Sequence, residues 1–175
     1  FYDLADKYGI MVWQEFPQSS SAIENVPCKS KKFLKGLKAA AIHAIKEKRN
    51  HASMCIWCGG NELRDFNEIP VDFTDINIKM LLKEVKRLSP RTPMLPSSAS
   101  GPNEMRIPGQ GRDVNHDVHG VWVYSGVKEH YDFYNNSDCM LHSEFGVEGM
   151  SGLEAIRKFL SPEYIGVFDK QHPVW

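Results

Sequence analysis

The feature that most constrains this chain is an alternation between short apolar runs and longer segments with helical periodicity. Residues 10–13 and 52–58 are apolar runs of strand length, and an unbroken apolar run is typical of a strand buried on both faces of a parallel sheet. Helical spacing follows each run, over about residues 30–48, where Ser30 is suited to cap the helix, and over 76–88. Such strand–helix repeats form right-handed units of a parallel sheet, either an open doubly wound layer or a (β/α) barrel.

Weaker candidates extend this pattern toward both ends of the chain. Further short strands are expected at residues 92–95, 114–118 and 139–141, and helices at 2–8 and 152–159. The first of these helices should stop at Gly9, because glycine readily adopts the left-handed conformation found after helix ends. The sequence therefore predicts about five strands.

The glycine pattern distinguishes the two architectures. No GxGxxG motif follows a predicted strand and no Walker-type phosphate loop occurs in the sequence. Those motifs carry nucleotide binding in doubly wound sheets. The favoured fold is therefore α/β, a partial TIM (β/α)8 barrel of about five parallel strands.

Charge and hydropathy restrict the partners. The 175 residues include 21 basic and 22 acidic side chains, for a net charge of -1. This balance gives no electrostatic reason to expect a nucleic-acid or anionic-membrane partner. No apolar run approaches the roughly 18 to 20 residues of a membrane span. A neutral substrate fits this composition better.

Four scattered cysteines, Cys28, Cys55, Cys58 and Cys139, do not form a disulfide framework. A metal or redox protein built on His51, Cys55 and Cys58 is one alternative. Residues three apart on a strand point to opposite faces, which argues against shared coordination, so no metal site is predicted. Cytoplasmic, periplasmic and extracellular locations all remain compatible with this cysteine usage.

Polar or acidic residues stand at the ends of three predicted strands, as Gln14-Glu15, Asn61-Glu62 and Ser143-Glu144. In a (β/α) barrel these ends converge on one mouth, where active sites lie. Two carboxylates across that mouth can cleave a glycoside, one protonating the leaving oxygen while the other attacks the anomeric carbon. Glu62 and Glu144 are the predicted pair, with carboxyl groups about 5–5.5 Å apart. The alternative makes them a helix-start acid and a solvated loop acid.

The same residues resemble a known family. The segment 57–62, WCGGNE, resembles the acid/base motif of glycoside hydrolase family two, and 143–146, SEFG, resembles its nucleophile motif. Their order and wide separation also match. The segments 1–6, 12–16 and 49–51 are most similar to the β-mannosidase branch.

This resemblance implies that Glu62 is the proton donor on barrel strand four and Glu144 the nucleophile on strand seven. Residues 1–175 would then be one partial catalytic domain holding strands three to seven. Strands one, two and eight and the β-sandwich domains would belong to the rest of a larger parent enzyme, from which this segment was excised. Neither a metal nor an organic cofactor is required by such a mechanism.

Further residues are expected at the mouth. The Asn61 amide could bond the sugar 2-hydroxyl, although a turn role is the alternative. His119 and Trp122 follow the weak strand expected at residues 114–118 and are candidates for substrate contact. A hydrogen-bonded loop histidine and a core tryptophan are equally compatible with the sequence. Gln14 and Glu15 are also mouth candidates.

The expected substrate is a carbohydrate β-glycoside. A β-mannoside leads, followed by β-glucosaminide, β-galactoside and β-glucuronide. A different class remains open, in which the piece is an inactive carbohydrate-binding or structural barrel fragment. Trp13 is expected in the core, because its strand is apolar on both faces. Apolar surface at Met11 and Val12, on the open barrel edge, should favour self-association.

Overall fold

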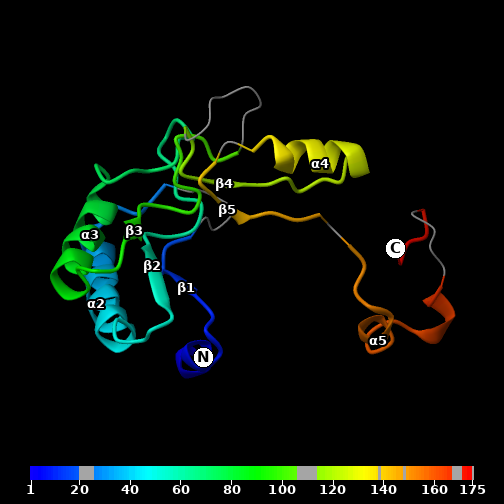
Figure 1. Ribbon diagram of the computed structural model, residues 1–175, viewed down its shortest axis with the longest axis horizontal. Helices are drawn as coiled ribbons and strands as arrows, with labels where there is room; N and C mark the ends of the chain where they lie inside the picture. The colour runs from blue at the N-terminus through cyan, green and yellow to red at the C-terminus, as the bar shows by residue number, and fades with distance from the viewer. Residues whose placement is uncertain (20–25, 106–113, 138, 148, 167–170, 175) are drawn as a thin grey trace.

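The computed structural model describes residues 1–19, 26–105, 114–137, 139–147, 149–166 and 171–174 (Figure 1). The elements follow the order α1 (Tyr2–Tyr8), β1 (Val12–Glu15), α2 (Lys31–Lys48), β2 (Met54–Cys58), α3 (Ile76–Leu88), β3 (Met94–Leu95), β4 (Asp117–His119), α4 (Val127–Asn135), β5 (Leu141–Glu144), α5 (Leu153–Ile156) and a 3-10 helix, Pro162–Tyr164. Within these ranges no helix is both long and apolar enough to cross a membrane.

The described strands form two parallel sheets. One has the order β1-β2-β3, and the other pairs β4 with β5. Isolated bridges join Asn61 to Ser98, after the ends of β2 and β3, and Met105 to His119, at the end of β4. Strand β3 is short because Pro96, directly after it, has no backbone N–H to continue the ladder. The predicted partial barrel with five parallel strands is confirmed, although the strands divide into sheets of three and two.

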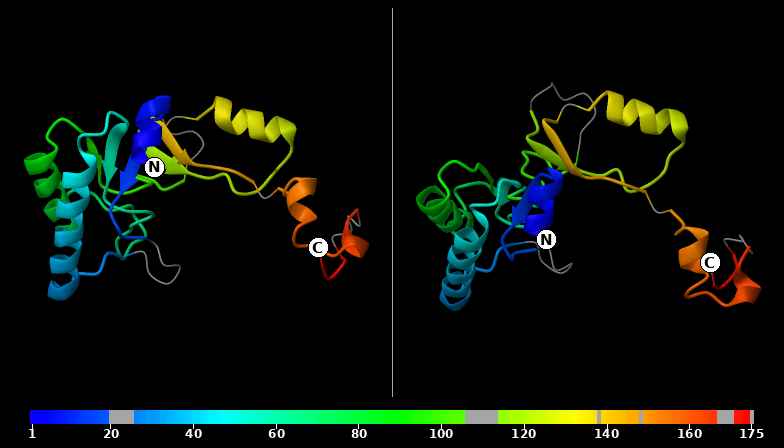
Figure 2. Two further views of the ribbon diagram at one scale, coloured as in Figure 1. Left: turned by 90° about the horizontal axis from the view of Figure 1, so that it is seen from below. Right: turned by 60° about the horizontal axis from the view of Figure 1, so that its bottom comes forward.

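The packed part of the molecule is the three-stranded sheet and its two long helices. Figure 2 shows α2 and α3 side by side along this sheet. The core residues include Phe16, Leu37, Ala41, Ile45, Met54, Trp57, Leu63, Ile78, Leu81 and Val85. Phe16 and Trp57 stack with ring centroids 5.4 Å apart. This core fixes the C-terminal ends of β1 and β2, from which two of the predicted acids extend.

Local signals in the N-terminal half behave as predicted. The Ser30 side chain accepts a hydrogen bond from the Phe33 N–H at 3.2 Å and so caps α2. Gly9 ends α1 with a left-handed φ of 68°. Gly9 thus allows the backbone to turn from α1 toward β1, and Ser30 satisfies a backbone N–H in the first turn of α2.

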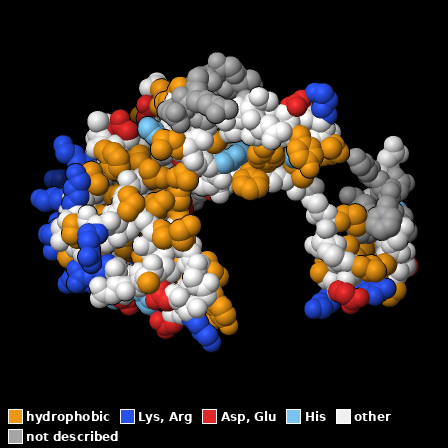
Figure 3. Space-filling view, viewed as in Figure 1, with side chains coloured by type: hydrophobic (Ala, Val, Ile, Leu, Met, Phe, Trp, Pro, Cys, Tyr) orange, Lys and Arg blue, Asp and Glu red, His pale blue; other side chains and the backbone are white. Residues whose placement is uncertain are grey.

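The C-terminal half differs from the prediction in two elements. The helix α4 was not predicted, and no residue of it is buried. The helix expected over 152–159 is shorter, since α5 ends at Ile156. Only Ile156 of this helix is buried, so little packing supports a longer helix. Figure 3 shows this C-terminal part extending from the body around an open arc.

The exposed apolar surface at the start of β1 is smaller than predicted. Met11 is 79% exposed, as expected, but Val12 is only 7% exposed. Val12 pairs with Met54 of β2 and joins the core, so the prediction of an exposed Val12 is wrong.

Two isoleucines on α3 test the role of the core. Ile78 is fully buried, whereas Ile76 is 55% exposed. Ile78→Ala should lower the free energy of unfolding by about 2–5 kcal/mol, because it removes buried methyl groups and leaves a cavity. Ile76→Ala is the matched control and should change it by less than about 0.5 kcal/mol. Urea unfolding curves followed by circular dichroism measure both; equal losses would contradict this packing.

Candidate active site

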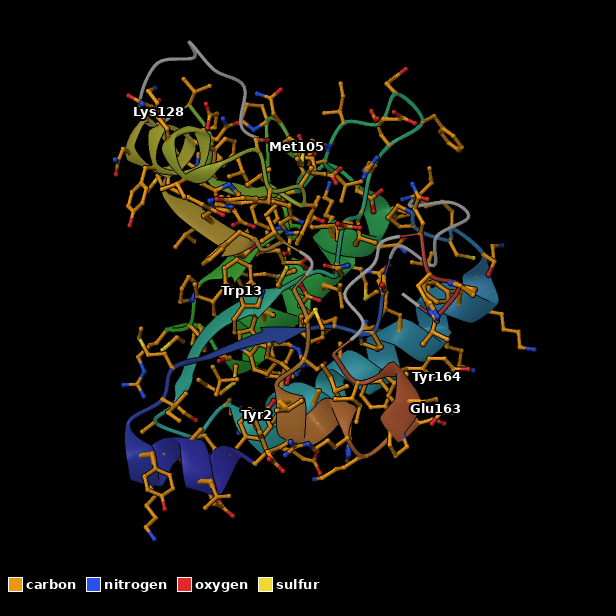
Figure 4. All side chains as sticks on the ribbon, turned by 90° about the vertical axis from the view of Figure 1, so that its right-hand side faces the viewer. Tyr2, Trp13, Met105, Lys128, Glu163 and Tyr164 are labelled. Carbon is orange, nitrogen blue, oxygen red and sulfur yellow. The ribbon has the colours of Figure 1, made fainter. Side chains whose placement is uncertain are left out.

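A cleft of about 520 Å³ lies where the two sheets meet. Its lining comes from β1, from the segment after β3 and from β5, and comprises Trp13, Glu15, Ser98, Leu141, His142, Ser143 and Glu144. Figure 4 shows Trp13 between β1 and β5. The volume is that of a small-molecule site. The prediction that Trp13 packs in the core is wrong, since this residue is only partly buried and faces the cleft.

Two glycines bring the turn after β2 close to its neighbours. A Cβ at Gly59 would lie 2.1 Å from the carbonyl oxygen of Pro96. A Cβ at Gly60 would lie 2.4 Å from the carbonyl oxygen of Gln18. No side chain fits at either position, so the glycines allow the backbone to approach both flanking segments and carry Glu62 toward the cleft.

Glu62 is held by its own backbone. It adopts a left-handed φ of 51°, an uncommon conformation outside glycine, and its N–H donates to the carbonyl oxygen of Ser98. The preceding residue, Asn61, forms bridges with Ser19 on one side and Ser98 on the other. The acid/base candidate and its neighbouring amide are therefore fixed between the segments that follow β1 and β3.

His119 brings the two predicted carboxylates together. Its imidazole is fully buried, with Nδ1 3.2 Å from Oε1 of Glu62 and Nε2 3.8 Å from Oε1 of Glu144. The Glu62 side chain is 24% exposed and the Glu144 side chain 40%. Both acids therefore retain access to solvent while sharing one buried partner. Their roles and their mutual spacing stay predictions.

A chain of hydrogen bonds continues behind His119. Its Nε2 lies 2.8 Å from Oγ of Ser98, which lies 3.1 Å from Oγ of Ser143. Ser143 donates to Asp117 twice, from Oγ at 2.8 Å and from its N–H at 3.0 Å. Asp117 is fully buried. Sequence reasoning did not assign Ser98 or Asp117 to the site. The signal in the sequence was Asp117 itself, an aspartate beside an apolar residue in a predicted strand. A carboxylate buried in a strand requires hydrogen-bond partners, which would have pointed to such a network.

Burial raises the pKa of two carboxyl groups at the site. Burial raises the pKa of Glu15, and the charge of Glu144 raises it further. Burial also raises the pKa of Asp117, against the opposing effect of the two hydrogen bonds from Ser143. Burial raises the pKa of the Cys58 thiol far above its usual range, so this group stays protonated.

Two groups of described residues could each offer three ligand atoms to a cation. They are Asp3, Asp6 and His51, and Glu62, Glu104 and His119. In the first, Asp6 already accepts hydrogen bonds from His51 and from the Ser53 N–H, which tie α1 to the start of β2. In the second, Glu104 is paired with Arg64. Neither group includes a cysteine, and all four cysteines are free thiols.

Of the predicted site residues, Glu15 and Glu144 line the cleft, whereas Gln14, Asn61, Glu62, His119 and Trp122 do not. Gln14 points from the opposite face of β1 to Trp13 and Glu15, and its side chain accepts a hydrogen bond from the Tyr2 hydroxyl. Trp122 is 45% exposed, which excludes the core-packing alternative. Thus Glu62, Glu144, His119 and Glu15 meet at one place, with Asn61 beside Glu62 in the chain.

Similar proteins include several glycosidases. "Beta-mannosidase B" of Aspergillus niger is 27% identical over 182 residues, covering 93% of this chain, and the protein of the same name from Aspergillus clavatus is 26% identical. The crystal structure of β-D-mannosidase from Dictyoglomus thermophilum has a TM-score of 0.69 and 28% identity over 93% of this chain. A β-glucuronidase from Parabacteroides merdae shares the fold, with a TM-score of 0.56 and 22% identity over 83% of this chain.

These similarities concern one part of larger proteins. The chain spans about 20% of the length of the two fungal relatives and of the Dictyoglomus protein, and 18% of the Parabacteroides protein. Residues 1–148, most of the chain, match the family model described as "Glycosyl hydrolases family 2, TIM barrel domain". The resemblance inferred from the two glutamate motifs is confirmed, and the chain belongs to the glycosyl hydrolase family 2 TIM barrel domains.

Proposed function

We propose that this chain is part of the catalytic core of a retaining β-glycosidase. The observation that carries the proposal is the contact of Glu62 and Glu144 with one buried imidazole, His119, beside a cleft of ligand size. Glu62 follows β2 of one sheet and Glu144 ends β5 of the other, which supports a proton donor and an attacking group on opposite sides of a glycosidic bond. Family membership supports the same reaction class.

The reaction proceeds in two displacements. Glu144, ionised, attacks the anomeric carbon and forms a glycosyl ester, while Glu62 gives its proton to the departing oxygen. Glu62, now ionised, removes a proton from water, and the hydroxyl displaces Glu144 from the sugar. Each step inverts the anomeric centre, so the product keeps the β configuration. His119 holds both carboxyl groups in position.

Neighbouring residues orient the sugar. The Asn61 amide is proposed to bond the 2-hydroxyl, an interaction that strengthens as positive charge develops on the ring. Glu15 lines the cleft and offers a carboxyl group to a sugar hydroxyl, and burial raises the pKa of this group. Trp13 supplies an apolar face in the cleft. Trp122 and Gln14 are assigned no direct contact.

A β-mannoside is the proposed substrate. The relatives at 26–28% identity are named β-mannosidases, from two fungi and a bacterium. The β-glucuronidase neighbour, at 22% identity, supports the fold alone. The described residues that line the cleft include no lysine or arginine, which fits a neutral sugar better than a uronic acid.

Product stereochemistry tests this function. The full-length protein should hydrolyse an aryl β-mannoside and release β-mannose first, seen by proton NMR before mutarotation. The aryl α-mannoside is the control and should not react; aryl β-glucuronide and β-glucosaminide test the choice of sugar. First release of α-mannose would refute retention. Binding without turnover would favour a carbohydrate-binding or structural domain.

A further inference from the structure

The hydrogen-bonded chain behind His119 ends at a carboxyl group that the proposed reaction does not use. This chain, the serine relay, consists of Asp117, Ser143, Ser98 and His119. Asp117 and His119 are fully buried and Ser98 is 2% exposed, whereas Ser143 is exposed to the cleft. The relay leads from a carboxyl group enclosed by protein to the acid/base candidate Glu62.

Each hydroxyl in the relay has one hydrogen to donate, so the direction of the bonds follows from Asp117. When Asp117 is ionised, it accepts from the Ser143 hydroxyl. Ser143 must then accept from Ser98, and Ser98 must accept from Nε2–H of the imidazole. A neutral imidazole in this form presents a lone pair at Nδ1, toward Glu62. Glu62 satisfies it only when protonated.

The reverse direction is equally complete. When Asp117 is protonated it donates to Ser143, and every bond along the relay turns around. The imidazole then accepts at Nε2 and carries its hydrogen on Nδ1, from which it donates to an ionised Glu62. Burial raises the pKa of Asp117, an effect that acts in favour of this second form.

We propose that the serine relay passes one proton between Glu62 and Asp117. Glu62 gives its proton to Nδ1 of His119, and Nε2 gives its own to Ser98. Ser98 gives its proton to Ser143, and Ser143 gives its proton to Asp117. No bond between heavy atoms changes, and the total charge is conserved. Asp117 is a positioning residue in this account, because it acts on the substrate only through Glu62.

The relay would adjust Glu62 to its two tasks, and this inference rests on the proposed function. With Asp117 ionised, the lone pair at Nδ1 favours protonated Glu62, which is the form needed to assist departure of the leaving group. After that proton is given away, the same lone pair makes ionised Glu62 a stronger base toward water. Other titratable or charged groups face the relay or Glu62: Glu15, Cys58, Arg64, Glu104, His142 and Glu144.

Asp117→Asn reverses the relay permanently. The Asn Oδ1 must accept from the Ser143 N–H, as Asp117 Oδ1 does. Its amide nitrogen then takes the place of Oδ2 and can only donate to the Ser143 hydroxyl. His119 is forced to carry its hydrogen on Nδ1 and to stabilise ionised Glu62. The alkaline limb of the kcat/KM profile for an alkyl β-mannoside should move to lower pH by roughly one unit.

Ser98→Ala separates a relay from a simple field effect. Without the Ser98 hydroxyl, Nε2 loses its acceptor and the hydrogen again favours Nδ1, so this variant alone should move the limb in the same direction. Asp117→Asn added to Ser98→Ala should then cause little further shift. Full additivity of the two shifts would overturn the relay, because it would mean that the charge of Asp117 acts on Glu62 directly. An unmoved limb in both single variants would overturn it too.

The controls are matched in type and burial. Ser100 has a buried hydroxyl with no hydrogen-bond partner among the described residues, so Ser100→Ala should leave the profile unchanged. Glu84→Gln removes a buried carboxylate paired with Arg87 on α3 and should also leave it unchanged. If Asp117→Asn does not fold, comparison of Ser98→Ala with Ser100→Ala still decides, since equal profiles would refute the relay.

One further variant keeps this inference apart from the proposed function. Glu62→Gln should remove the alkaline limb and most turnover of the alkyl substrate, because amides do not titrate in this range. If the limb survives in Glu62→Gln, the assignment of Glu62 as the acid is wrong. If it is lost there but unmoved by the Asp117 and Ser98 variants, only the relay is wrong.

Discussion

Glu144→Ala is expected to lower kcat for an aryl β-mannoside by on the order of 10⁵-fold, the scale seen when an enzyme loses its covalent nucleophile. Glu144 stands at the end of β5, in the cleft, with its carboxylate 3.8 Å from Nε2 of His119. Alanine leaves space at that position but no group that can attack the anomeric carbon. Initial-rate kinetics of the full-length protein measure the loss.

Azide provides the control for this variant. It is small enough to enter the space left by the side chain and is a nucleophile without need of a general base. It should restore turnover of Glu144→Ala in a single displacement and give an α-mannosyl azide. Rescue with retained β configuration would reverse the role assigned to Glu144, and activity close to that of the unaltered protein would remove it from the mechanism.

Glu62→Ala is expected to behave differently. General acid–base assistance contributes about 10²- to 10⁴-fold, and an aryl leaving group of low pKa needs little protonation. The first displacement should therefore survive with an activated aryl mannoside, giving a burst of phenol, while hydrolysis of the ester is slow because water lacks its base. An alkyl mannoside should lose turnover almost completely.

Azide again distinguishes the outcomes. In Glu62→Ala it needs no deprotonation to attack the accumulated ester, so it should raise the steady-state rate and give a β-mannosyl azide. The dependence of rate on leaving-group pKa should also become steeper than in the unaltered protein. Equal losses for aryl and alkyl substrates, with no azide effect, would mean that Glu62 is not the proton donor.

The N-terminal half was readable from the sequence because its signals are local. Two apolar runs with helical segments behind them, Ser30 at a cap position and Gly9 after a helix predict the observed elements closely. The C-terminal half depends more on contacts between distant segments. Helix α4 buries no residue, so no apolar stripe facing a core marks it in the sequence.

The site divides in the same way. Glu62 and Glu144 were identified because each follows a strand in a short motif, and the structure brings them to one imidazole. The contribution of Ser98 and Asp117 depends on a side-to-side approach of segments far apart in the chain, which spacing does not reveal. Trp13 was misplaced because an apolar run does not show which face of its strand opens into a cleft.

The most direct test of the central claim is to trap the covalent intermediate. A 2-deoxy-2-fluoro-β-mannosyl fluoride should label the full-length protein, since fluorine at C2 destabilises both transition states while the fluoride leaving group preserves the first step. Mass spectrometry of peptic fragments should place one fluoromannosyl group on Glu144, and Glu144→Gln should remain unlabelled. A label on Glu62 or Glu15 instead would contradict the assignment of Glu144 as the nucleophile.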